Sequence, residues 1–114
     1  MRKLWFTGVI SVALFFPVFA QDTQPAAPKE GRIQQRKQNQ QKRIGQGVSS
    51  GQLTAGETTR LEGKEARVNR EVRNDRKANG GTLTPQEKRQ VNRQQNRISK
   101  DIYRDKHNAK TQAK

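Results

Sequence analysis

The chain has 114 residues, and its 24 Lys and Arg against ten Asp and Glu give a formal net charge of +14. It has no cysteine, which excludes disulfides, thiolate metal sites and a lipid-modified lipoprotein. Only 29% of the residues are hydrophobic and 5% aromatic. This composition alone is typical of a disordered chain, but the apolar periodicity described below favours a thin helical core.

Residues 1–20 have the pattern of a secretory signal peptide. A basic start precedes an apolar run over residues 4–16, and residues 18–20 form a cleavage site. The run is too short for a comfortable membrane span. We therefore expect an exported bacterial protein, periplasmic or extracellular, without a transmembrane span after cleavage. Loss of Arg2 and Lys3 with this segment lowers the net charge from +14 to +12.

The remaining chain divides by composition. Residues 21–29 contain two prolines and no apolar period, so we expect a flexible linker. Residues 30–109 are predicted to form one helical repeat domain, and residues 110–114 a flexible basic tail.

The first predicted helix begins near residue 30. Its sequence is rich in Gln, a good helix former, and Ile33 and Ile44 stand eleven residues apart on one helical face. Gly45 and Gly47 predict the end of this helix.

Residues 50–79 and 80–109 repeat one pattern with a spacing of thirty residues, and each copy opens with G-x-L-T-x-x-E. A Thr followed three residues later by Glu predicts a capping box, and Pro85 fits the first helical position of the second copy. The matched positions are Gly51/Gly81, Leu53/Leu83, Thr54/Thr84, Glu57/Glu87, Arg67/Arg97 and Asp75/Asp105.

Apolar residues after each capping box recur at i, i+7 and i+11, which is one narrow helical stripe. The pattern predicts helices over about 55–78 and 85–107. We expect an all-α fold in which three helices, built from two helix-turn-helix repeats, pack their stripes together. The predicted core contains Ile33, Ile44, Val48, Leu53, Leu61, Val68, Val72, Leu83, Val91, Ile98, Ile102 and Tyr103.

Charged residues flank the stripe at matched positions. Arg67 precedes Glu71 by four residues, and Arg97 precedes Asp101 by four, which predicts an ion pair along each helix. The acid pairs Glu62/Glu65 and Glu71/Asp75 are expected on a charged surface.

The repeated motif also resembles the second half of an EF-hand loop. Glu57 and Glu87 occupy the twelfth position of that loop, with Gly at the sixth and an aliphatic residue at the eighth. The carboxylates of the first half are missing, although Asp75 and Asn79 could add oxygen ligands near the second loop. Calcium binding is thus an alternative to the interpretation in which the motif only turns the chain and caps the next helix.

Two family resemblances follow from these residues. The segments GQLTAGETTRLEGKEARVNREVR and NGGTLTPQEKRQVNRQQNRISKDIYRDKHN resemble a group of small exported bacterial proteins without an assigned function, which have degenerate EF-hand-like repeats. More distantly, L-T-P-Q-E at residues 83–87 is similar to the LTxxQ motif of Spy/CpxP-type periplasmic proteins. That resemblance implies a stress-linked chaperone or sensor, but Glu57 and Glu87 replace the Gln of that motif.

Catalytic signatures are lacking. The single histidine, His107, falls in a basic tail next to a helix end, where a solvated side chain or a helix-terminal charge is expected. No Ser, His and Asp constellation and no phosphate-binding glycine loop is present, so we expect no enzymatic activity and no cofactor.

The positive charge is the remaining functional signal. It predicts contact with anionic cell-envelope polymers or an acidic protein partner, the alternative being that charge only maintains solubility. With one aromatic residue after position 20, specific nucleic-acid recognition is not expected. The sequence gives no indication of an oligomeric state. The predicted polyanion surface comprises Arg36, Arg43, Arg60, Arg67, Arg70, Arg73, Arg89, Arg93, Arg97 and Arg104.

Overall fold

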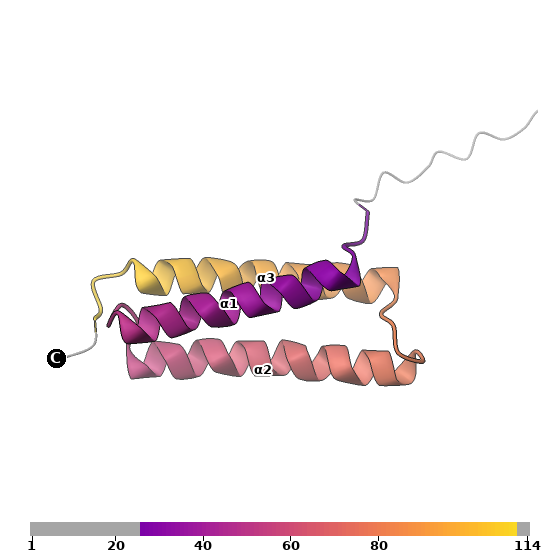
Figure 1. Ribbon diagram of the computed structural model, residues 1–114, viewed down its shortest axis with the longest axis horizontal. Helices are drawn as coiled ribbons and strands as arrows, with labels where there is room; N and C mark the ends of the chain where they lie inside the picture. Colours follow the sequence, from indigo (N-terminus) through magenta and orange to yellow (C-terminus); the bar gives the residue numbers. More distant parts are fainter. Residues whose placement is uncertain (1–25, 112–114) are drawn as a thin grey trace, which may run out of the picture.

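The structure is a computed structural model, and it describes residues 26–111. This part of the chain forms three helices and no strand: α1 (Glu30–Ser49), α2 (Ala55–Ala78) and α3 (Pro85–Lys106). The helices run alternately up, down and up, so α1 and α3 are parallel and α2 is antiparallel to both (Figure 1). The all-α three-helix prediction is confirmed. Within residues 26–111, no helix is long and apolar enough to cross a membrane.

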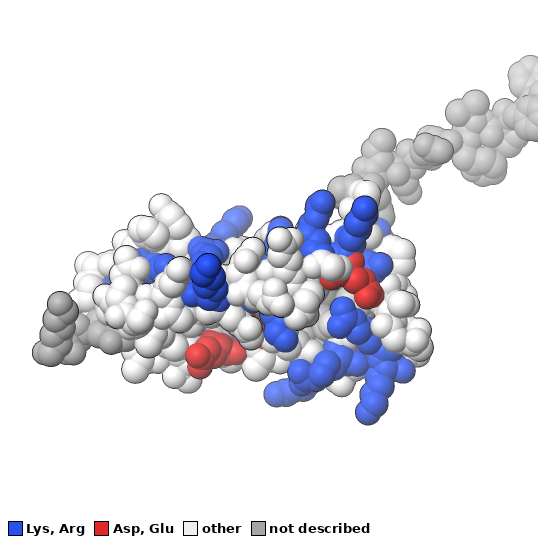
Figure 2. Space-filling model, in the orientation of Figure 1, with Lys and Arg blue, Asp and Glu red and all other residues white. Residues whose placement is uncertain are grey.

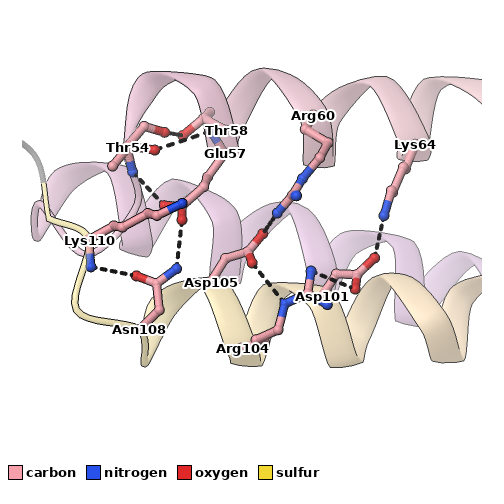
Figure 3. A network of polar contacts seen from close by, with 10 residues as sticks. All are labelled: Thr54, Glu57, Thr58, Arg60, Lys64, Asp101, Arg104, Asp105, Asn108 and Lys110. Atoms are coloured by element: carbon pink, nitrogen blue, oxygen red, sulfur yellow. Dashed lines mark hydrogen bonds and ion pairs between the residues drawn. The ribbon is translucent and has the colours of Figure 1, made fainter.

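The predicted signal peptide, residues 21–25 of the linker and residues 112–114 of the tail lie outside the described residues. The residues that follow α3 contact the start of α2. The side chain of Asn108 donates to Glu57 Oε1 at 2.6 Å, and the backbone N–H of Lys110 donates to Asn108 Oδ1 at 2.9 Å. Residues 108–110 therefore fold back against the first turn of α2 (Figure 3).

Both predicted capping boxes are confirmed. The Thr54 hydroxyl accepts from the Glu57 N–H at 3.2 Å, and Glu57 Oε2 accepts from the Thr54 N–H at 3.0 Å. Thr84 and Glu87 make the same two bonds, at 3.2 and 2.8 Å, and α3 begins at the proline that follows. Each box satisfies amide groups that the helix itself leaves unpaired, which stabilises a helix by about 1 kcal/mol.

Glycines turn the chain at both corners. Gly51 has a φ of 75°, and Gly80 and Gly81 have φ values of 74° and 112°, in the left-handed region that other residues rarely adopt. The predicted end of the second helix at these residues is confirmed, since α2 stops at Ala78.

Buried residues follow the inner seam of each helix. Along α2 these are Leu61, Glu65, Val68 and Val72, at successive spacings of four, three and four residues. This is the a/d spacing of a helical bundle. Burial of each Leu, Ile or Val side chain stabilises the fold by about 1.5–3 kcal/mol. The buried apolar residues are Ile33, Ile44, Leu53, Leu61, Val68, Val72, Leu83, Val91, Ile98 and Ile102.

The predicted end of the first helix is wrong. α1 continues through Gly45 and Gly47 to Ser49. Gly47 has a packing role instead, because a Cβ on it would lie 2.6 Å from the side chain of Leu53. The absence of a side chain lets Leu53 enter the core against the last turn of α1, and its N–H donates to the Gly47 carbonyl at 3.0 Å.

Two predicted core residues are exposed. Val48 is 39% exposed, because Gly47 and not Val48 occupies the next seam position after Ile44. Tyr103 is 61% exposed and stacks on His107 with ring centroids 4.1 Å apart. Ile102 already fills the seam position at this level, so the neighbouring side chain points outward.

Candidate anion-binding groove

A groove of about 490 Å³ runs between α2 and α3 on the outside of their seam. Val68 and Ile98 contribute apolar lining, and Asp101 contributes the single carboxylate. Around them stand the basic side chains of Lys64, Arg67, Arg97, Lys100 and Arg104.

The matched arginines of the two repeats meet in this groove, since Arg67 and Arg97 immediately precede Val68 and Ile98 in sequence. Five basic residues against one carboxylate leave a net charge of +4 in the lining. The repeat therefore brings its arginines together across the seam by placing equivalent faces of α2 and α3 side by side.

The predicted ion pairs along the helices are wrong, and this frees the arginines. Glu71 accepts instead from the amides of Gln90 and Gln94, at 2.5 and 2.8 Å, across the α2–α3 interface. No described residue forms an ion pair or hydrogen bond with the side chain of Arg67, Arg97 or Lys100. Their charges are available to a ligand.

A network of ion pairs includes three residues of the groove lining (Figure 3). Lys64 pairs with Asp101, which also pairs with Arg104 at 3.0 Å. Asp105, with a side chain only 3% exposed, pairs with Arg60 and with Arg104 at 3.2 Å. Burial opposes ionisation of Asp101, but the bond from Lys64 and the nearby basic charges outweigh it, so its pKa lies below the ordinary value.

Four of the ten predicted arginines form hydrogen bonds or ion pairs with other residues of the bundle. Arg36 donates to Asn92 and Asn96 of α3 at 2.8 and 2.6 Å, and Arg43 donates to the Ser99 carbonyl at 3.4 Å. Arg60 and Arg104 belong to the network above. Arg36, Arg43 and Arg60 thereby link one helix to another, whereas Arg104 pairs with acids of its own helix.

The other arginines are distributed over several surfaces. Arg70, Arg73, Arg89 and Arg93 lie outside the groove and have no ion pair within residues 26–111. On the face drawn in Figure 2, Lys and Arg form separate clusters with uncharged surface between them. Among the ten predicted arginines, Arg67 of α2 and Arg97 of α3 lie together in one groove.

A second basic hollow lies where α2 ends. It is lined by Arg73, Arg76 and Lys77 beside the glycines of the turn. Arg76 is already engaged there with Glu30 of α1, at 3.7 Å. The end of a helix also carries a partial negative charge, which disfavours an anion. The α2–α3 groove is therefore the better candidate.

The carboxylates of the EF-hand-like motifs are used by the protein itself. Hydrogen bonds from Thr54 and Asn108 lower the pKa of Glu57, and those from Thr84 and Asn79 lower the pKa of Glu87. The Asn79 side chain donates to Glu87 through its nitrogen at 2.7 Å. These bonds compete with any metal for the same oxygens.

The other suggested metal ligand, Asp75, lies near Glu87. Burial, followed by the charges of Glu87 and Glu71, raises the pKa of Asp75. Among residues 26–111, no three His, Cys, Asp or Glu side chains form a group that could hold a metal ion.

Sequence reasoning missed the environment of one acid. Glu65 was expected on a charged surface, but it is 6% exposed and lies on the inner seam of α2. Gln95, its repeat equivalent, is 3% exposed, and Gln40 of α1 is 2% exposed. The a/d spacing of the sequence indicates that these positions are buried. Residues 65 and 95 fit this spacing when polar residues are counted together with apolar ones.

Comparisons of the chain with models of protein families, with curated proteins and with solved structures find no match.

Proposed function

We propose that this protein is an exported, non-enzymatic binding protein that holds anionic cell-envelope polymers in the α2–α3 groove. The supporting observation is that Arg67, Arg97 and Lys100 line one groove and form no ion pair with any residue that the structure describes. A groove with this charge attracts a polyanion from a distance.

Arginine suits this role because its planar guanidinium binds phosphate, sulfate or carboxylate groups through two parallel hydrogen bonds. The apolar lining of Val68 and Ile98 reduces competition from water beside the two arginines. Lys64 and Arg104, which are held by Asp101, add charge at a fixed position and extend the site along the groove.

The test uses heparin as a soluble polyanion and compares two variants with the same loss of charge. Arg67→Gln with Arg97→Gln removes the two unpaired groove arginines. Arg70→Gln with Arg93→Gln removes two unpaired arginines outside the groove. We expect the groove variant to bind about tenfold more weakly, because two charge-assisted contacts are lost, and the control variant about twofold more weakly.

The salt dependence separates specific contacts from general attraction. Plotted as log affinity against log salt, the groove variant should lose about two units of slope, one for each lost contact, and the control variant less. Equal weakening in both variants would show that only net charge matters. Binding that is insensitive to salt, or a preference for an acidic protein over the polymer, would overturn the proposal.

A further inference from the structure

A second groove, of about 580 Å³, lies on the other side of α2, between α2 and α1. Its apolar lining comes from Ile44, Gly45, Val48 and Ala66. Its charged lining consists of Glu62 and Glu65, and no Lys or Arg contributes to it. The remaining lining residues are uncharged and polar. This lining differs from that of the α2–α3 groove, where five of the nine residues are basic.

Glu65 is the polar centre of this groove. The residue is 6% exposed, and its Oε1 atom is buried without a hydrogen-bond partner within residues 26–111. Leaving such an oxygen unpaired is costly, which makes the atom a strong acceptor for any donor that reaches it. A buried carboxylate without a partner is therefore an observation independent of the shape of the groove.

The groups that face Glu65 do not neutralise it. Lys37 of α1 is near enough for its charge to act on Glu65, but it forms no ion pair with it among the described residues. Glu62 on the same helix adds negative charge, and α3 contributes only the uncharged Gln95 and Ile98. Burial is the main reason that the pKa of Glu65 rises to about 7, with Lys37 opposing and Glu62 adding to the effect.

We propose that the α1–α2 groove binds a small organic cation, an alkylammonium compound whose chain lies along Ile44, Val48 and Ala66 and whose ammonium group donates to Glu65. The lining carries negative charge in a protein that is otherwise strongly basic, so a cation is preferred here. The groove lies within the size range of small-molecule sites and combines an apolar wall with a few polar groups, as such sites do.

The geometry of the bundle leaves room for this ligand. α1 and α2 pack less closely against each other than either packs against α3. Gly45 and Ala66, which line the groove from opposite helices, have little or no side chain. These small residues leave space on the α1–α2 side for the chain of the ligand.

The test titrates hexylammonium chloride into isotopically labelled protein at pH 7.5 and follows the amide resonances. We expect shifts at Gly45, Glu65 and Ala66 with a dissociation constant on the order of 1 mM, appropriate for a ligand of this size. Hexanol, which has the same chain without the charge, should bind at least about fivefold more weakly. Equal binding of hexanol would overturn the proposal.

Two matched variants test which carboxylate contacts the ammonium group. Glu65→Gln retains the shape of the side chain and should weaken hexylammonium binding about tenfold, the value of one lost charge-assisted contact. Glu62→Gln removes an exposed carboxylate from the same groove and should weaken it less than about threefold. Unchanged affinity in Glu65→Gln, with a native circular dichroism spectrum, would contradict the assignment.

Protonation gives an independent measurement on the unmutated protein. The cation needs the ionised form of Glu65, so hexylammonium binding should weaken as the pH falls from 8 to 5.5. The pKa of Glu65, followed by its carboxyl carbon resonance, should fall when hexylammonium binds. A pKa that stays constant on saturation would show that the ammonium group does not contact this carboxylate.

Discussion

The two grooves beside α2 differ in how their carboxylates are used. Along the α2–α3 interface, Asp101 and Asp105 are each paired with two basic side chains. Along the α1–α2 interface, Glu65 has a buried oxygen with no hydrogen-bond partner in the described part of the chain. Asp101 and Asp105 each pair with a basic residue of α2, whereas Lys37 of α1 acts on Glu65 without forming an ion pair with it among the described residues.

This difference shows that net charge says little about local chemistry. The chain has a net charge of +14, but it forms one groove lined by unpaired arginines and another that contains an unpaired carboxylate. The two grooves differ because residues that are close in sequence lie on opposite sides of the inner seam. Lys64 and Glu65 are adjacent, but Lys64 lines the α2–α3 groove and Glu65 the α1–α2 groove. Adjacent residues on a helix point about 100° apart, so they serve different interfaces.

The largest effect on stability is expected from the paired acid. Asp105→Asn removes the charge that holds Arg60 and Arg104 and should lower the free energy of unfolding by about 2 kcal/mol, as expected for charged hydrogen bonds with one partner exposed. Urea denaturation followed by circular dichroism measures this. A variant as stable as the parent would show that the network adds nothing to the α2–α3 interface.

The unpaired acid should behave in the opposite way. Folding raises the pKa of Glu65 from 4.5 to about 7, so the folded state binds more protons than the unfolded state between these two pH values. The stability that this group contributes is therefore lost as the pH rises through that range. Glu65→Gln should therefore raise the free energy of unfolding by about 1 kcal/mol at pH 8, less than the full pKa shift implies because water reaches the groove.

The pH dependence of that variant provides its control. At pH 4 the parent carboxyl is protonated in both states, so the two proteins should be about equally stable. Glu57, Glu87 and Asp101 have lowered pKa values and lose their stabilising effect as the pH falls, but they do so in both proteins and cancel from the difference. A difference that does not change with pH would contradict the role of Glu65 ionisation.

The smallest effect should come from the ion pair that links α1 and α2. Arg76 and Glu30 are 3.7 Å apart and both are about one third exposed. Arg76→Gln should change the free energy of unfolding by less than about 0.5 kcal/mol, since exposed pairs are weak. A loss comparable with that of Asp105→Asn would mean that the α1–α2 interface depends on ion pairs after all.

The sequence predicts the corners and the apolar core well, because both follow from local rules. Thr54 with Glu57 and Thr84 with Glu87 form their boxes from residues three apart, and ten of the twelve predicted core side chains are buried. The twofold repeat makes these patterns easier to recognise, because each feature occurs twice at the same spacing.

The misses concern residues whose surroundings are set by another element. Gly47 continues α1 because Leu53 packs against it, which its own neighbours in sequence do not reveal. Arg67 and Arg97 lose their expected partners because Glu71 and Asp101 bind across the α2–α3 interface. The two grooves therefore follow from the packing of the helices, and composition alone predicts only that some basic surface exists.

The central claim is that the α2–α3 groove binds anions and the α1–α2 groove binds cations. The most direct test is to titrate one isotopically labelled sample first with a short heparin oligosaccharide and then with hexylammonium chloride. We predict that the oligosaccharide shifts resonances of Arg67, Arg97 and Lys100, that these shifts disappear at high salt, and that hexylammonium then shifts Gly45 and Ala66. Oligosaccharide shifts spread evenly over all basic residues, or concentrated in the α1–α2 groove, would contradict the account.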